Sequence, residues 1–522
     1  MNRPVFPRLR SVPTTRSSRS KAVVIALLVL CAAMTMLATK APSYSRQQHT
    51  SVGKLSARPA GYENIQHVIV MFQENRSTDN LFHGLPNADT ANVGLNSKGV
   101  LVQLKPVALA SQYGLGHSHG SFVAMYNGGR MNGADQIAVT CGEKAKNCPP
   151  ANPQFKYVRK KDIVPYFQMA QQYVFGDRMF QTNQGPSFPA HQFIISGTSA
   201  PTTDSERFAV DNPFGDPRSF ADTGCTAPPK EFVKLINRFG VIDSKQYPCF
   251  DHPTLPDLLD NAGLSWRYYT PAPDNIWTGP NAIYHLRFGS GWNNVIPEPT
   301  RILADISKGE LPNVSWVIPN GPACDHPKGN HGLGPSWVAS VVNAIGKSQY
   351  WSNTVILVTW DDWGGWYDHV PPPIVTLGSH QWGAGYAYGF RVPLMIISAY
   401  AKPSYVSHVT HDFGSIVRLI EAVFQLPSLG YADAYADDLS DSFDWSQKER
   451  AFRRIPAPFE ANYFLNDHTP AGEPDDVGVC GGIHRRGYNR RNPPRPRVHF
   501  RQCRWTATAF HGERWRAHLP DG

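Results

Sequence analysis

Two pairs of polar residues each follow a short apolar run, and their side chains could bind a cation. Glu74 and Asn75 form the first pair, and Asp361 and Asp362 form the second. A carboxylate beside a carboxamide offers two oxygen ligands to a hard cation. Two adjacent aspartates repel each other unless a cation or hydrogen-bond donors offset their charge. The four residues are therefore candidate metal ligands.

Each pair also has a structural interpretation. The segment ENRSTDN (74–80) could begin a helix, with Asn75 or Ser77 as its cap. The segment WDDWGGWYDH (360–369) could be a solvated loop, but its Trp and Tyr residues disfavour that interpretation. Its two adjacent glycines would let the backbone turn tightly beside the acids.

Ser187 lies between Gly185-Pro186 and Pro189, a context that predicts a rigid, exposed turn around its hydroxyl. A serine becomes a nucleophile when a base or a metal lowers the cost of forming its alkoxide. The segment lacks the GxSxG pattern of α/β-hydrolases, which disfavours that type of site. A purely structural serine is the alternative.

Five histidines lie in segments that could border such a site. They can protonate a leaving oxygen or bind phosphate oxygens at mildly acidic pH. Each one alone could equally be an ordinary loop or core histidine. They are His117, His119, His285, His326 and His331.

The elements around these residues predict an α/β fold. Apolar runs at 65–72, 354–360 and 392–400 are typical of buried strands, and helices are expected at about 336–345 and 413–424. Strands alternating with helices favour a mostly parallel sheet with helices on both faces. Functional groups of such sheets gather beyond the carboxyl ends of the strands, where both polar pairs stand.

Two long segments, 85–160 and 200–300, are rich in Gly, Pro, Asn and aromatic residues. They predict long loop insertions that cap the sheet and could form a lid over a substrate. Together with the strands, they belong to one expected catalytic domain at 63–466.

The N-terminal residues 1–45 have the pattern of an export signal or of an uncleaved membrane anchor. Basic residues end at Lys21, and residues 22–38 carry no charge. Exported protein would be periplasmic, secreted or attached to the cell envelope. A buried helix of the fold is the alternative, and residues 46–62 are expected to be a linker.

The net charge of +9 is concentrated in the two ends of the chain. Residues 1–45 carry a charge of +7 and residues 485–522 carry +8, so the remainder is acidic, at −6. A basic groove for nucleic acid is therefore not expected on the folded part. Residues 467–522 are expected to be a disordered Arg- and Pro-rich tail, or the product of a shifted reading frame.

Cysteine usage agrees with export. Cys141 and Cys148 lie close in sequence, as do Cys225 and Cys249, so local disulfides can form in an oxidising compartment. The sequence has no CxxC motif and no Cys/His spacing typical of a zinc site.

The sequence resembles the bacterial phosphoesterase family that contains non-haemolytic phospholipases C and a respiratory-burst-inhibiting acid phosphatase. The resemblance spans roughly residues 63–430. It rests on HVIVMFQENRSTDNLF, GPSFPAH, the DHP of 325–327, TVILVTWDDWGGWYDHVPPP and YGFRVPLMIISAYAK. Many phospholipases of the family have Thr in place of Ser187 and an Asp-Glu pair in place of the two aspartates, so this chain looks more like the acid-phosphatase branch.

The resemblance implies an alkaline-phosphatase-like α/β fold with one divalent metal ion. It implies that Ser187 takes the phosphoryl group and that His117, His285 and His326 surround the phosphate oxygens. His119 could replace His117, and with His331 it is a candidate for substrate binding. The ligands implied for the metal are Glu74, Asn75, Ser187, Asp361 and Asp362.

The hypothesis is therefore an exported hydrolase of phosphate esters, with a monoester or a phospholipid diester as substrate. Aromatic residues in the second insertion could accommodate the second organic group of a diester; they include Trp266, Tyr268, Trp277 and Trp292. A sulfatase-like hydrolase on the same fold is one alternative, although no Arg stands four positions after Ser187. The other is a non-catalytic surface protein that binds lipid or glycan.

Overall fold

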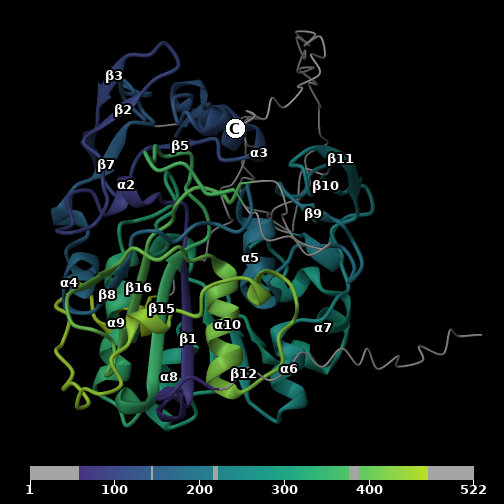
Figure 1. Cartoon of the computed structure of the whole chain (residues 1–522), viewed down its shortest axis with the longest axis vertical. Coiled ribbons are helices and arrows are strands. Elements are labelled where there is room, and N and C mark those ends of the chain that lie inside the picture. The colour runs from purple at the N-terminus through teal and green to yellow at the C-terminus, as the bar shows by residue number, and fades with distance from the viewer. Residues whose placement is uncertain (1–57, 143–144, 216–221, 375–386, 468–522) are drawn as a thin grey trace, which may run out of the picture.

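A computed structural model describes residues 58–467, except 143–144, 216–221 and 375–386 (Figure 1). The expected export segment, the first part of the linker and the C-terminal tail lie outside the described residues. Within them, no helix is both long enough and apolar enough to cross a membrane.

An eight-stranded sheet forms the centre of the fold, in the order β13-β12-β14-β1-β15-β16-β8-β17. All neighbouring strands are parallel except β16, which runs antiparallel to β15 and β8. The sheet thus confirms the predicted mostly parallel α/β fold. The strands are β1 (His67–Gln73), β8 (Val174–Gly176), β12 (Trp266–Tyr269), β13 (Val295–Ile296), β14 (Val314–Val317), β15 (Thr354–Trp360), β16 (Leu394–Ser398) and β17 (Tyr405–Ser407).

The strands β1 and β15 lie side by side near the middle of the sheet, and all of their residues are buried. Continuous apolar runs form such strands because both faces of the sheet are covered. The next strand, β16, runs antiparallel to β15, and the described part of the connection between them contains no helix. A parallel neighbour would need a crossover helix.

Helices cover both faces of the sheet. On β1, the ring of Phe72 lies 5.9 Å from the rings of Phe413 and His191. Phe72 is paired with Thr359 of β15, so the next residue, Trp360, faces the opposite side of the sheet. There its ring lies 5.2 Å from the ring of Tyr166. One layer therefore contains α5 (Ser187–Ser196) and α10 (Phe413–Phe424), and the other contains α4 (Val164–Gln172), α8 (Arg301–Lys308) and α9 (Gly334–Gly346).

The first insertion, 85–160, forms small sheets above the carboxyl ends of β1 and β15 (Figure 1). β2 pairs with β3, β4 with β7, and β5 with β6. The elements in and before it are α2 (Thr78–Leu81), β2 (Val93–Leu95), β3 (Leu101–Gln103), β4 (Lys105–Val107), β5 (Tyr113–Leu115), α3 (His119–Tyr126), β6 (Val139–Cys141) and β7 (Lys156–Val158).

A separate small hydrophobic core joins this insertion to the loop after β15. Trp363 and Trp366 of that loop are fully buried in it. The ring of Phe390 lies 5.2 Å from Trp363, and the ring of Phe122 lies 6.5 Å from it. The aromatic residues of the second acidic motif are therefore packed rather than solvated.

The second insertion is only partly a cap, which corrects the expectation for 200–300. Its first part forms a three-stranded sheet, but β12 and β13 belong to the central sheet. Trp266, Tyr268 and Trp277 are consequently core residues and not part of a substrate-facing surface. The remaining elements are β9 (Arg207–Ala209), β10 (Val233–Asn237), β11 (Ile242–Gln246), α6 (Leu255–Asn261) and α7 (Tyr284–Phe288), with α11 (Ala461–Leu465) near the end of the described chain.

Both expected local disulfides are present. One joins Cys141 to Cys148, and the other joins Cys225 to Cys249. Each closes a loop within an insertion, so the disulfides brace the segments that have the least regular structure.

Candidate active site

The register of β1 and β15 brings the two polar pairs together. Gln73 and Trp360 are paired at the carboxyl ends of the two strands, and the Asp361 amide continues the ladder by donating to the Gln73 carbonyl at 3.0 Å. Glu74 follows directly on the neighbouring strand. The predicted meeting of the two motifs at one edge of the sheet is therefore observed.

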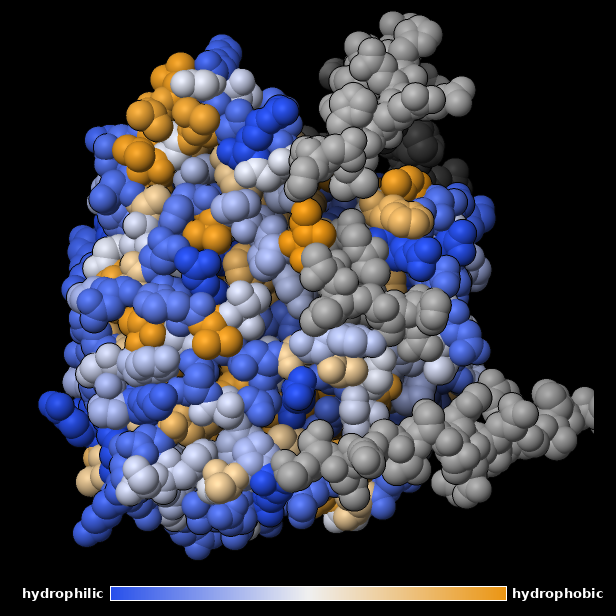
Figure 2. All heavy atoms as spheres, viewed as in Figure 1, coloured by the Kyte–Doolittle hydropathy of each residue, from blue (hydrophilic) through white to orange (hydrophobic). Residues whose placement is uncertain are grey.

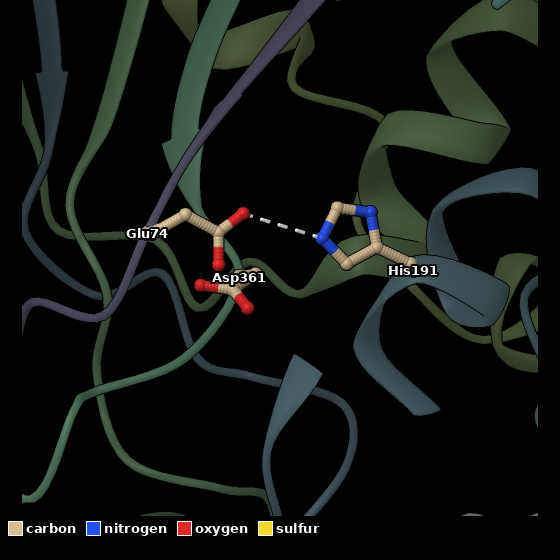
Figure 3. Close-up of side chains that lie close together, drawn as sticks. All are labelled: Glu74, His191 and Asp361. Atoms are coloured by element: carbon tan, nitrogen blue, oxygen red, sulfur yellow. Dashed lines mark ion pairs between the residues drawn. The ribbon is translucent and has the colours of Figure 1, made fainter. Parts of the chain in front are cut away.

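Glu74 and Asp361 share the site with His191, a residue that the sequence analysis did not single out (Figure 3). One ligand atom from each of the three lies within 4.8 Å of the others, and all three side chains are fully buried. His191 Nε2 is 3.5 Å from Glu74 Oε1. Its position four residues after Ser187 was the available signal, because residues four apart share one face of a helix.

The hydrogen bond at the other nitrogen of His191, Nδ1, determines the tautomer and orientation of the ring. His191 Nδ1 is 3.1 Å from the Tyr268 hydroxyl, whose own proton goes to the Trp277 carbonyl at 2.7 Å. Burial raises the pKa of Tyr268, and the charges of Glu74 and Asp361 raise it further. Tyr268 therefore stays protonated and accepts from Nδ1, so Nε2 is the nitrogen that faces the carboxylates.

Asn75 adopts an uncommon backbone conformation that turns it into the site. Its φ is +60°, in the left-handed region that Asn tolerates better than most residues. Its amide N–H donates to Asp361 Oδ1 at 3.1 Å. This bond links the first motif to the second.

The Asn75 carboxamide lies between the carboxylates and two imidazoles. One terminal atom is 3.1 Å from Glu74 Oε2 and 3.2 Å from Asp361 Oδ1. The other is 3.0 Å from His117 Nε2 and 3.2 Å from His326 Nε2. Without an ion, the carboxamide nitrogen faces the carboxylates and donates to them; with a cation among these atoms, the oxygen faces the same way as a third oxygen ligand.

Asp362 completes the acidic group. Its amide N–H donates to Asp361 Oδ1 at 2.8 Å, and its Oδ1 accepts from the Gly364 amide at 2.6 Å. Gly364 has a φ of +65° and packs against the Asn75 backbone. The double glycine therefore turns the loop as predicted and orients Asp362, whose Oδ2 is 3.8 Å from His117 Nε2.

Ser187 is the first residue of α5 and is fully buried, which corrects the expected exposed turn. Pro is compatible with the first turn of a helix because no intrahelical N–H bond is lost there. Ser187 Oγ has no hydrogen-bond partner among the described residues. The preceding loop is held by Asn183 and Gln181, whose side-chain amides donate to the Gly185 carbonyl at 2.8 and 3.0 Å.

His117 and His326 are both brought to the site. Their rings are 6.1 Å apart, and each Nδ1 contacts a backbone carbonyl, of Leu115 and Pro327 respectively. Donation from Nδ1 leaves Nε2 of both rings directed at Asn75. Both rings therefore border the group of Glu74, Asn75 and Asp361, and their role toward a phosphate stays a prediction.

Asp325 fixes the position of His326. Its carboxylate accepts from the Tyr166 hydroxyl at 2.9 Å and from Trp360 Nε1 at 3.0 Å, and its carbonyl accepts two bonds from Arg76. Burial raises the pKa of Asp325 to about 6, although Arg76 opposes the shift. The DHP motif is therefore anchored to β15 and to the first motif.

The structure does not bring His285 to the site, which corrects that expectation. Both of its ring nitrogens are occupied, Nδ1 by Asp251 at 2.5 Å and Nε2 by Asp257 at 3.0 Å. Against the effect of burial, these two carboxylates raise the pKa of His285 to about 9. His285 therefore forms ion pairs that join two segments of the second insertion.

The other two expected histidines occupy different surroundings. His119 begins α3, is buried, and contacts the Gln184 carbonyl at 3.4 Å, close to the loop that carries Ser187. Burial lowers the pKa of His119, although the Asp211 charge opposes the shift. His331 is exposed, and its backbone amide bonds to the Pro322 carbonyl.

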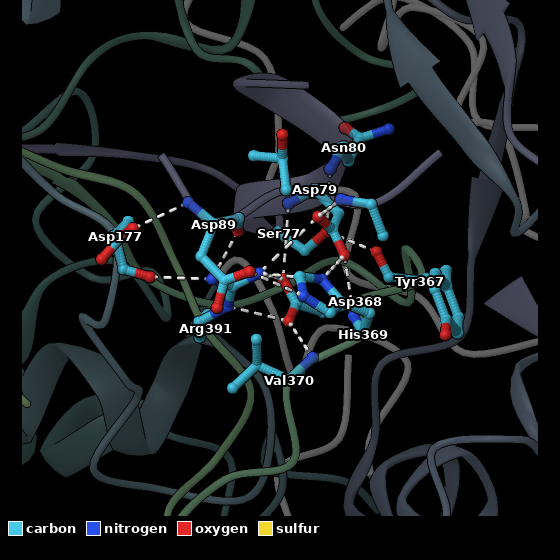
Figure 4. A network of polar contacts seen from close by, with 12 residues as sticks. Ser77, Asp79, Asn80, Asp89, Asp177, Tyr367, Asp368, His369, Val370 and Arg391 are labelled. Carbon is cyan, nitrogen blue, oxygen red and sulfur yellow. Dashed lines mark hydrogen bonds and ion pairs between the residues drawn. The ribbon is translucent and has the colours of Figure 1, made fainter. Parts of the chain in front are cut away.

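Two further acid–histidine groups serve the fold. Asp79, Asp368 and His369 surround Arg391, which is fully buried and donates to Asp368 at 2.9 and 3.2 Å (Figure 4). The guanidinium supplies the positive charge that the two carboxylates need. The other group, His411 with Asp437 and Asp441, is tied to a Ser407 hydroxyl that donates to Asp441 at 2.5 Å.

Comparison with known proteins decides the family. The phosphoesterase family profile matches residues 65–427, which is more than half of the chain. The chain belongs to the phosphoesterase family. This match confirms the resemblance seen in the sequence. The matched span contains both polar pairs, Ser187, and the histidines His117 and His326.

Curated relatives of this phosphoesterase-family chain are phospholipases C. It is 23% identical over 460 residues to the hemolytic phospholipase C of Pseudomonas aeruginosa, covering 74% of this chain but only 57% of that protein. It is 22% identical over 450 residues to phospholipase C A of Mycobacterium tuberculosis, covering 76% of this chain and 80% of that protein. A crystal structure of an alkaline phosphatase superfamily protein from Vibrio parahaemolyticus matches with a TM-score of 0.31 and 12% identity, covering 71% and 70% of the two chains.

The donors in the site fit the divalent ion that the family implies. Glu74 and Asp361 each have an oxygen within 3.2 Å of the Asn75 carboxamide, and His191 adds an imidazole nitrogen within 4.8 Å of both carboxylates. Carboxylate and amide oxygens with one imidazole suit several divalent cations. Buried carboxylates that lie this close together are stabilised by such a cation.

Proposed function

We propose that the chain is a metal-dependent phosphoric ester hydrolase in which Ser187 is the nucleophile. The observation that supports it best is that Glu74 and Asp361 lie within 4.8 Å of His191, which stands on the helix that begins at Ser187. This arrangement supports a single site that combines acidic ligands, an imidazole and the buried Ser187 hydroxyl. The ligands we assign to a divalent ion are Glu74, Asn75, Ser187, Asp361 and Asp362, with His191 as an additional one.

The first turn of α5 suits a phosphate group. The N-terminus of a helix carries partial positive charge and free amide groups, which favour an anion. Ser187 stands at this terminus, so its hydroxyl and a bound phosphate would lie together. A divalent ion held by the acidic group would neutralise phosphate charge and lower the cost of the Ser187 alkoxide.

In the proposed reaction, the Ser187 hydroxyl gives its proton to a water molecule and Oγ attacks phosphorus. The Oγ–P bond forms while the P–O bond to the alcohol breaks. His117 or His326, in its imidazolium form, gives the alcohol oxygen the proton on Nε2, because the Nε2 atoms of both rings face the site. Water then attacks the phosphoserine and releases phosphate or a phosphorylated head group.

The substrate class we propose is the phospholipid. The support comes from the relatives, which are named phospholipases C in both Pseudomonas aeruginosa and Mycobacterium tuberculosis. Export, which the pattern of residues 22–38 predicts, would bring the chain to membrane phospholipids outside the cytoplasm; it stays a prediction. The sulfatase-like and non-catalytic alternatives have less support, because the family match covers the whole candidate site.

Replacement of the nucleophile tests the mechanism. Ser187→Ala should abolish hydrolysis of p-nitrophenylphosphorylcholine while leaving the far-ultraviolet circular dichroism unchanged. Ser196→Ala is the matched control, since Ser196 lies at the other end of α5 and its hydroxyl bonds only to the Gln192 and Thr198 carbonyls. Near-normal turnover by Ser187→Ala would show that another group is the nucleophile.

Substrate and metal are tested together on the full chain. We expect turnover of p-nitrophenylphosphorylcholine to exceed that of p-nitrophenyl phosphate, and a chelator to remove it until a divalent ion is restored. Preference for the monoester would instead support an acid phosphatase. Turnover that is unaffected by exhaustive chelation would contradict the metal.

A further inference from the structure

Two β-hairpins expose apolar side chains at the same end of the molecule as the site. The β2–β3 hairpin exposes Val93, Val100 and Leu101, and the last of these is 69% exposed. The β10–β11 hairpin exposes Phe239, at 66%, with Val241 and Ile242. Exposed apolar residues are ordinary when they are scattered, but grouping on two hairpins indicates a contact surface.

The alternation within the first hairpin shows that its outer face is unusual. Val102 and Leu104 point inward and are buried, as the core-facing positions of a hairpin should be. The residue between Val100 and Val102 points the other way and would normally be polar. Here it is Leu101, so the hairpin is apolar on both faces.

The two hairpins stand on opposite sides of the carboxyl edge of the sheet. Figure 1 shows β2 and β3 above one side of β1 and β15, with β10 and β11 above the other side. Figure 2 shows hydrophobic atoms gathered over each hairpin. A flat partner that meets this end of the molecule would touch both hairpins.

Basic side chains accompany the apolar ones. Lys98 lies in the β2–β3 turn, and Lys105 follows β3; both are exposed. Arg238 precedes Phe239 and lies over its ring at 5.0 Å, and Arg238 makes no ion pair among the described residues. Lys245 on β11 is also exposed and lies 3.8 Å from the Phe232 ring.

Acidic residues also lie near the hairpins. Asp135 accepts from the Ser97 amide and hydroxyl at 2.8 and 2.7 Å. Asp243 pairs with Arg207 at 2.8 Å. Of the two hairpins themselves, residues 93–103 carry Lys98 and no acid, and residues 233–246 carry Lys234, Arg238 and Lys245 against Asp243. Both hairpins therefore have a net positive charge, which complements the phosphates of lipid head groups.

We propose that the β2–β3 and β10–β11 hairpins form a docking surface for a phospholipid bilayer. Apolar side chains enter the boundary between head groups and acyl chains, and the neighbouring Lys and Arg contact phosphates. Two separate convex tips match a planar bilayer better than a second copy, because a stable protein dimer needs a continuous complementary surface. The choice of phospholipid rests on the proposed function. The docking surface would hold the end of the molecule that carries the site against the bilayer.

Hydrogen–deuterium exchange with vesicles tests the docking surface locally. The full chain is mixed with vesicles of phosphatidylcholine and phosphatidylglycerol, and exchange is followed in peptides from both hairpins. We expect slower exchange at 96–101 and 237–242 on vesicle addition. Unchanged exchange at both hairpins overturns the proposal, whatever the N-terminal segment contributes to overall binding.

Matched variants test the side chains. Leu101→Ser combined with Phe239→Ser should remove the protection and weaken the hairpin-dependent vesicle binding by at least about tenfold. Phe288→Ser is the control, because Phe288 is 60% exposed but lies on α7, lower on the flank of the molecule (Figure 1). A control that loses as much protection as the double variant would contradict the assignment.

Two further readouts separate this proposal from others. Hydrolysis of soluble p-nitrophenylphosphorylcholine should be equal in the double variant and the unmodified chain, because neither residue lies in the site. If the unmodified chain fails to hydrolyse it but still shows vesicle protection, the proposed function fails and the docking surface stands. A dimer that the double substitution converts to a monomer, without vesicle protection in either form, would identify a second copy as the partner and overturn the lipid.

Discussion

Gly364→Ala is a direct test of how the two polar motifs are coupled. A Cβ at this position would lie 2.3 Å from the Asn75 carbonyl oxygen and 2.9 Å from the Asn75 Cβ, whereas ordinary contacts begin near 3.4 Å. Relief requires the Asn75 backbone or the loop after β15 to move by about 1 Å. Either movement shifts a proposed metal ligand.

The cost of this substitution has two parts that a control can separate. The φ of +65° would strain any residue with a Cβ by about 1–2 kcal/mol. Gly263 has a φ of +69° and no described atom within 4 Å of the added Cβ, so Gly263→Ala carries the strain without the clash. Overpacking at position 364 should add about 1–3 kcal/mol to the loss of stability.

Denaturant unfolding and hydrolysis of p-nitrophenylphosphorylcholine measure the two effects. Gly263→Ala should lose about 1–2 kcal/mol of the free energy of unfolding and keep its activity. Gly364→Ala should lose more stability, and its kcat/KM should fall by about a hundredfold, as expected for a displacement of 1 Å. The coupling is refuted if Gly364→Ala retains kcat/KM within a few-fold of the unmodified chain.

Three other predictions follow from neighbouring contacts. His191→Ala should raise the divalent-ion concentration needed for half-maximal activity by about tenfold or more, measured by metal titration, and unchanged metal dependence would remove His191 from the ligand set. His285→Gln should reduce stability by about 1–2 kcal/mol near pH 6, after discounting for its partial exposure, and activity should be unaffected. The pKa of His285 in the folded chain, about 9, is above its ordinary value. The stability that the ion pairs contribute is therefore fully present below pH 6.5 and is lost as pH rises through 9. Equal losses of stability at pH 6 and pH 10 would contradict the ion pairs. Arg391→Met should cost about 3–5 kcal/mol because Asp79 and Asp368 would be buried without their cation, and a loss below 1 kcal/mol in denaturant unfolding would show that the network is dispensable.

The centre of the fold was predictable because its signals are local and strong. The runs that became β1 and β15 are continuous and apolar, and α10 begins and ends at the predicted residues, 413 and 424. Parallel pairing then placed Glu74 beside Asp361, since residues after paired strand ends must be neighbours. The acidic part of the site follows from this pairing alone.

What sequence reasoning missed depended on short elements and on long-range partners. β12 and β13 are only four and two residues long and lie in a Gly- and Pro-rich stretch. Neither is long enough to show the alternation of apolar and polar residues that indicates a strand. The proline at position 189 suggested a turn, although proline is tolerated in the first turn of a helix. His285 resembled a site histidine until its two aspartates, 34 and 28 residues away in the chain, were seen to occupy both nitrogens.

The insertions do more than cover the site, because one of them shares a core with the loop that carries Asp361 and Asp362. Trp363 and Trp366 follow those acids directly and are buried among insertion residues such as Phe122. The indoles therefore anchor the loop in a structure that the central sheet does not provide. The same insertion carries His117, whose ring closes the site from the other side of Asn75. A change in the packing of this small core would move Asp362 and His117 together. The aromatic residues of the motif are therefore interleaved with its acids because they hold those acids in place.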